Sequence, residues 1–100
     1  MIATKVATTT AEIEVHRKRI EEEKETLTIG FYECKKERAL LVALSESVDM
    51  SADDEEAFNT ALMELDLEKL RLEIHQLELR LLELDVDHME ALNKMLATYA

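Results

Sequence analysis

The C-terminal half of this chain carries two apolar stripes on nearly opposite sides of one predicted long helix. At about 100° per residue, the two stripes point roughly 150° apart. The first stripe alternates steps of four and three residues: Met63, Leu67, Leu70, Ile74, Leu77, Leu81, Leu84, His88, Ala91 and Met95. The second stripe recurs once per heptad and is widened near its end: Phe58, Leu65, Leu72, Leu79, Val86, with Leu82, Met89 and Leu96. A helix that is apolar on two sides needs packing partners on both.

The composition favours long helices over any other fold. The chain has 100 residues, no proline, no tryptophan and a single glycine, Gly30. Residues that break helices or form turns are therefore scarce, and the length suits one domain. We predict an all-α protein in which two long helices form an antiparallel, coiled-coil-like helical hairpin. Because such a hairpin leaves one stripe uncovered, we expect it to assemble into a four-helix-bundle-type oligomer.

The expected boundaries follow from capping and turn signals. Residues 1–9 are small and threonine-rich, and we expect a flexible N-terminal arm there. The helical hairpin would occupy residues 10–100, with helix 1 over about 10–47, a turn over about 48–52 and helix 2 over about 53–98. Thr9 and Glu12 have capping-box spacing for helix 1. Ser51 precedes four acidic residues, which suits the start of helix 2.

Helix 1 presents a narrower apolar signal. Its apolar residues recur every seventh position: Ile13, Ile20, Leu27, Cys34, Leu41 and Val48. Gly30 and its β-branched neighbours weaken the middle of the helix. They would mark a kink, a close approach of two helices, or a break whose two pieces wrap both faces of helix 2. We expect a continuous helix.

The two stripes of helix 2 are assigned by counting residues back from the turn. If the chain reverses near Met50, facing residues have numbers that add to about 101, which places Leu27 opposite Ile74 and Ile13 opposite His88. The predicted intrachain seam is then Ile20, Leu27, Cys34, Leu67, Leu70, Ile74, Leu77, Leu81 and Leu84. The second stripe remains as the predicted self-association interface: Phe58, Leu65, Leu72, Leu79, Leu82, Val86, Met89 and Leu96.

Charge and cysteine content narrow the partners and the location. The net charge is −11 at pH 7, and most of it lies in the second half of the chain. An acidic chain repels phosphates and anionic lipids, so we expect neither direct nucleic-acid binding nor membrane binding. Cys34 is the only cysteine, which suits a reducing compartment. With no secretory signal and no transmembrane span expected, we predict a cytoplasmic protein.

No residue pattern indicates catalysis, a cofactor or a metal. Asp85 with His88, and His75 with Glu78, stand one helical turn apart, as metal ligands can. Apolar residues rather than further ligands are expected opposite them. The sequence has no glycine-rich phosphate loop, and Cys34 has no evident base nearby. We therefore predict that the protein is not an enzyme and needs no cofactor.

The favoured function is a non-enzymatic protein–protein interaction module. It would self-associate, as a dimer, through the second stripe and serve a structural or adaptor role in an assembly, with a further protein partner also open. The alternative comes from the carboxylates along helix 2, which could imitate a phosphate backbone. The chain would then be a small acidic inhibitor, like some phage-encoded accessory proteins, that occludes the basic nucleic-acid-binding site of a partner. Salt would distinguish the two, because charge mimicry weakens steeply as salt rises.

Overall fold

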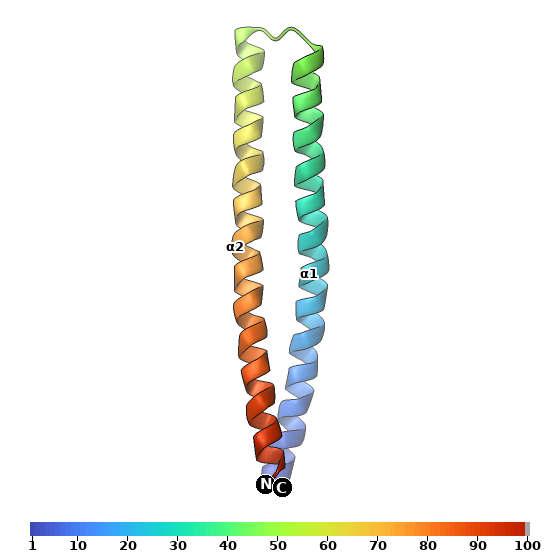
Figure 1. Cartoon of the computed structure of the whole chain (residues 1–100), viewed down its shortest axis with the longest axis vertical. Helices are drawn as coiled ribbons and strands as arrows, with labels where there is room; N and C mark the ends of the chain where they lie inside the picture. The colour runs from blue at the N-terminus through green and yellow to red at the C-terminus, as the bar shows by residue number, and fades with distance from the viewer. Residues whose placement is uncertain (100) are drawn as a thin grey trace. The chain divides into compact units, whose positions relative to one another are not determined.

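Two helices account for nearly all of the fold. The computed structural model describes residues 1–99, in which α1 runs over Ile2–Ser47 and α2 over Ala52–Ala97. No strand occurs in these residues. The two helices run in opposite directions and are joined by a short connection, drawn in green at the top of Figure 1. The predicted all-α fold with two long helices in a hairpin is confirmed.

The chain divides into two compact units, and each pairs a stretch of α1 with a stretch of α2. Unit 1 comprises Met1–Glu25 and Gln76–Ala100, of which the structure describes residues up to 99. Unit 2 comprises Thr26–His75 and contains the connection between the helices. We describe the two units separately.

The start of α2, in unit 2, is held by reciprocal hydrogen bonds. The backbone N–H of Asp54 donates to the Ser51 Oγ over 3.2 Å, and the backbone N–H of Ser51 donates to Asp54 Oδ2 over 3.4 Å. This is a capping box in which each side chain satisfies a free backbone donor of the other residue. Acidic residues at the positive end of the helix dipole add to the effect. The predicted helix start is thus confirmed.

The boundary predicted between an N-terminal arm at residues 1–9 and helix 1 is wrong, because α1 already begins at Ile2. The Thr8 and Thr10 hydroxyls donate to the carbonyls of Thr4 and Val6, one turn earlier. Thr9 lies inside the helix and caps nothing there. Nothing in this stretch breaks a helix, and Val6 is half-buried, so packing within unit 1 outweighs the weak helix propensity of threonine.

Gly30 marks a close approach of the two helices in unit 2. α1 is continuous through this residue, as expected, so the alternative of two wrapping pieces is wrong. A Cβ atom at position 30 would lie 3.0 Å from Cδ2 of Leu72 on α2. The missing side chain therefore makes room for a leucine of the second stripe.

The core joins the seven-spaced residues of α1 to the second stripe of α2. In unit 1, Ile13, Ile20 and Val86 form a buried cluster, and Leu82 and Met89 pack against it. Val86 is only 1% exposed. In unit 2, Leu27 is buried, while Cys34, Leu41, Phe58, Leu65 and Leu72 are half-buried.

The two stripes of α2 lie on the opposite sides from those predicted. The α1 half of the predicted seam is correct, since Ile20 and Leu27 are buried and Cys34 is half-buried. The α2 half is wrong, because all six of its residues are exposed: Leu67, Leu70, Ile74, Leu77, Leu81 and Leu84. The predicted self-association residues are buried or half-buried instead: Phe58, Leu65, Leu72, Leu79, Leu82, Val86, Met89 and Leu96.

A small difference in register explains the exchange of faces. Gly30 lies against Leu72 in unit 2, and Thr10 bonds to Asn93 in unit 1, so the paired numbers add to 102 and 103. The prediction used a sum of about 101. Since each residue turns a helix by about 100°, a slip of one or two residues brings the opposite face inward.

Candidate interaction surface

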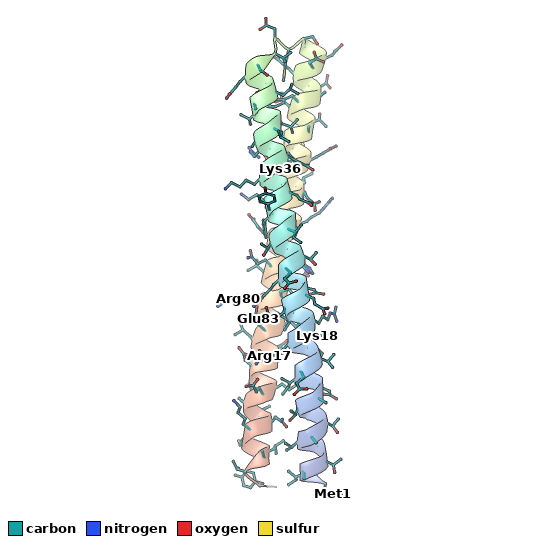
Figure 2. All side chains as sticks on the ribbon, turned by 90° about the vertical axis from the view of Figure 1, so that its right-hand side faces the viewer. Met1, Arg17, Lys18, Lys36, Arg80 and Glu83 are labelled. Carbon is teal, nitrogen blue, oxygen red and sulfur yellow. The ribbon has the colours of Figure 1, made fainter. Side chains whose placement is uncertain are left out.

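Ion pairs line the side of the helix pair in each unit, with the basic residue on α1. In unit 1, Arg17 reaches Glu90 over 2.7 Å and Asp87 over 2.9 Å, and Lys24 reaches Glu83 over 2.9 Å. Figure 2 labels Arg17 on α1 and Glu83 on α2. In unit 2, Arg38 pairs with Asp66. Exposed pairs contribute little to stability, so these pairs select the register more than they hold the fold.

These pairs keep both partners charged. The hydrogen bond from Arg17, and after it the one from Lys94, lowers the pKa of the Glu90 carboxyl. The hydrogen bond to Glu83 is the main cause that raises the pKa of Lys24. Both shifts favour the ionised form, as expected of cross-helix ion pairs.

A polar residue occupies one position of the unit 1 core. Asn93 is 8% exposed, and its Nδ2 donates to Thr10 Oγ1 over 2.9 Å and to the Val6 carbonyl over 3.4 Å. Its Oδ1 is buried without a hydrogen-bond partner. A single buried asparagine lowers the stability of a helix pair but specifies its register, because other registers leave the amide unbonded. Asn93 therefore helps to decide which stripe faces α1.

Replacing Asn93 by leucine is expected to raise the free energy of unfolding by about 1–2 kcal/mol, because the unbonded Oδ1 no longer has to be buried. Replacing Thr10 by alanine should instead lower it by about 1 kcal/mol, because it removes a hydrogen-bond partner of Asn93. Urea unfolding followed by circular dichroism measures both. A leucine variant less stable than the wild type would contradict this account.

The first stripe stays exposed along the described part of α2. Its large members are all about half exposed or more: Met63, Leu67, Leu70 and Ile74 in unit 2, and Leu77, Leu81, Leu84 and Met95 in unit 1. His88 and Ala91, which continue the pattern, are exposed as well. The steps of four and three residues are those of the a and d positions of a coiled coil. An exposed stripe of this kind usually marks an interface.

Charged residues of both signs flank the first stripe. In heptad terms they occupy the e and g positions next to the seam: Glu64, Asp66, Arg71, Glu73, Glu78, Arg80, Asp85, Asp87 and Lys94. Arg80 extends outward from α2 in Figure 2. Charges at such positions choose the partner and the orientation of a coiled coil.

A second, smaller apolar surface lies on α1 in unit 2. Ile29, Tyr32 and Leu40 are each more than half exposed. This group was not predicted from the sequence. The spacing of Ile29, Tyr32 and Leu40 could have revealed it, because these residues lie on the side of the helix opposite Leu27 and Cys34.

The described residues were also searched for a reactive thiol, a metal site and a membrane span. Cys34 borders a depression of about 400 Å³ lined also by Phe31 and Leu65, and burial raises the pKa of its thiol, which disfavours the reactive thiolate. Within residues 1–99, no three histidine, cysteine, aspartate or glutamate side chains gather as metal ligands. In the same residues, neither helix is long and apolar enough to cross a membrane.

No protein-family model, curated protein or solved structure matches this chain.

Proposed function

We propose that this chain is a non-enzymatic interaction module that self-associates, as a dimer, through the first stripe of α2. The observation that carries the proposal is an unbroken coiled-coil seam that stays exposed although the chain already has a core. The proposed function is the one expected from the sequence, a self-associating interaction module. The proposed interface is the first stripe instead of the second.

The apolar area of the first stripe suits a stable dimer. Burying a leucine-sized side chain fully contributes about 1.5–3 kcal/mol, so covering one that is half exposed contributes roughly 1 kcal/mol. The eight large exposed members on each of two helices would therefore contribute on the order of 15 kcal/mol. Association costs about 4–15 kcal/mol in lost freedom, and a micromolar dimer needs about 8 kcal/mol, so such a dimer forms where the cost lies toward the lower end of that range.

The dimer would serve as a scaffold within a larger assembly. In unit 2, the exposed group of Ile29, Tyr32 and Leu40 lies on α1 and stays available for a further protein partner. The acidity of the chain favours protein over nucleic acid or membrane as that partner. A lone, half-buried Cys34 is compatible with work in a reducing compartment such as the cytoplasm.

Sedimentation equilibrium of the wild-type protein tests this proposal. We expect twice the mass of one chain at high micromolar concentration, and a dissociation constant that does not rise with salt, because the interface is apolar. A monomer at every concentration and salt would refute the proposal. A monomer that binds a basic nucleic-acid-binding protein only at low salt would favour the acidic-inhibitor alternative instead.

A further inference from the structure

We infer that the second copy docks on the first stripe in parallel and in register, so that each stripe residue meets the same residue of the other copy. This inference rests on the proposed function and adds the direction of the partner to it. The first stripe belongs to one continuous helix, α2, although its members lie in two units. In the parallel arrangement the α2 stretch of each unit meets its own counterpart.

The residues of the seam favour the parallel direction. In parallel register every layer from Met63 to Leu84 consists of two large apolar side chains. The weaker layers, formed by His88 and Ala91, are then consecutive and near one end. An antiparallel docking with full overlap places Leu70 against His88 and Leu67 against Ala91, and symmetry repeats each mismatch. The parallel dimer therefore fills more of its layers with matched apolar groups.

The flanking charges favour the same direction. In parallel register, Asp66 lies beside Arg71 of the second copy, and Arg80 lies beside Asp85 of the second copy. Each attraction occurs twice by symmetry. Glu73 beside Glu78 of the second copy is the one repulsive combination. Attractive pairs thus outnumber repulsive ones. Because the two copies present the same surface to each other, every attractive pair on one side of the interface is repeated on the other.

The antiparallel alternative brings more like charges together. With full overlap, Arg80 faces Arg80 of the second copy, Glu78 faces its own counterpart, and Glu73 faces Asp87. These repulsions offset the attractions of Arg71 to Asp85 and of Asp66 to Lys94 of the second copy. Sliding the antiparallel pair by one heptad in one direction leaves Met63 and Leu67 outside the seam. Sliding it in the other direction keeps them but places Glu64 against Asp85 and Asp66 against Asp87 of the second copy.

Repulsion between the acidic first turns of the two α2 helices opposes the parallel direction only weakly. The parallel arrangement brings these two turns to the same end. These carboxylates are exposed and precede the first layer, at Met63, by two helical turns or more. Repulsion between exposed charges is screened within about 8 Å at physiological salt.

Disulfide crosslinking in a Cys34→Ser background tests the direction. A Leu70→Cys variant should form a disulfide-linked dimer with itself, because facing d positions of a parallel pair lie within reach of a disulfide. Mixing Leu70→Cys with His88→Cys should give no crosslink between the two variants, which differ in mass. A dominant crosslink between them would overturn the parallel direction and leave the proposed function standing. A reduced Cys34→Ser protein that sediments as a monomer would instead count against the proposed function.

A charge swap gives an independent readout. Arg80→Asp should weaken the dimer about fivefold to tenfold, since it turns two attractions into repulsions. Adding Asp85→Arg should restore the affinity only in the parallel arrangement, because the antiparallel one places the new arginine beside Arg71. A double variant weaker than Arg80→Asp alone would overturn the inference.

Discussion

Val86→Asp is expected to lower the free energy of unfolding by about 4 kcal/mol or more and to leave unit 1 largely unfolded. Val86 is 1% exposed and belongs to the cluster with Ile13 and Ile20. A carboxylate there would be buried in apolar surroundings without a partner, which is among the most destabilising changes known for point variants. Urea unfolding and far-ultraviolet circular dichroism measure the loss.

Leu84→Asp is the matched control, because it places the same side chain two residues away on the same helix. Leu84 is 55% exposed. At concentrations where the protein is monomeric, this variant should lose less than about 1 kcal/mol, as expected of a surface substitution. Equal losses from the two variants would mean that both stripes share one core. A larger loss at Leu84 would restore the seam predicted from the sequence.

Leu77→Lys combined with Leu81→Lys is expected to weaken self-association by at least about a thousandfold while leaving both helices intact. The two leucines are 65% and 64% exposed, so the hairpin does not depend on them. In the dimer each would lie in a central layer of the seam, and four lysines would replace four buried leucines. The lost burial and the added charge together amount to more than about 4 kcal/mol, and each 1.4 kcal/mol is a factor of ten. Sedimentation equilibrium and circular dichroism measure the two outcomes.

The control for this double variant uses the other exposed apolar surface. Ile29→Lys combined with Tyr32→Lys changes two residues that are exposed to a similar degree on α1. We expect this variant to keep the wild-type dimer. A monomer from the α1 variant, with a dimer from the α2 variant, would place the interface on α1 and refute the use of the first stripe.

Much of the fold was predictable because it depends on local chemistry. The absence of proline and the single glycine allow long helices, and Ser51 with the acidic residues after it specifies where α2 begins. Seven-residue spacing identified Ile13, Ile20 and Leu27 as the core of α1. The N-terminal arm was mispredicted because threonine reads as a weak helix former, whereas contacts with α2 hold Val6 and Thr10 in a helix.

The candidate surface was only half predictable. The sequence revealed both stripes of α2 and the need for a partner on each, but the more regular stripe was assigned to the intrachain seam. Regular spacing indicates that a stripe can form a coiled coil, but it does not identify whether the partner helix belongs to the same chain or to another. The group of Ile29, Tyr32 and Leu40 was missed because one face of α1 was already explained by its seven-spaced residues.

The sequence by itself determined that this protein is a pair of long helices with one apolar face more than a single hairpin can cover. Only the tertiary structure decided which face that is. The decision depends on contacts between residues far apart in the chain, such as Asn93 with Thr10, Arg17 with Glu90, and Leu72 with Gly30. Because a helix turns by about 100° per residue, a register difference of one or two residues exchanges the covered and the exposed stripe.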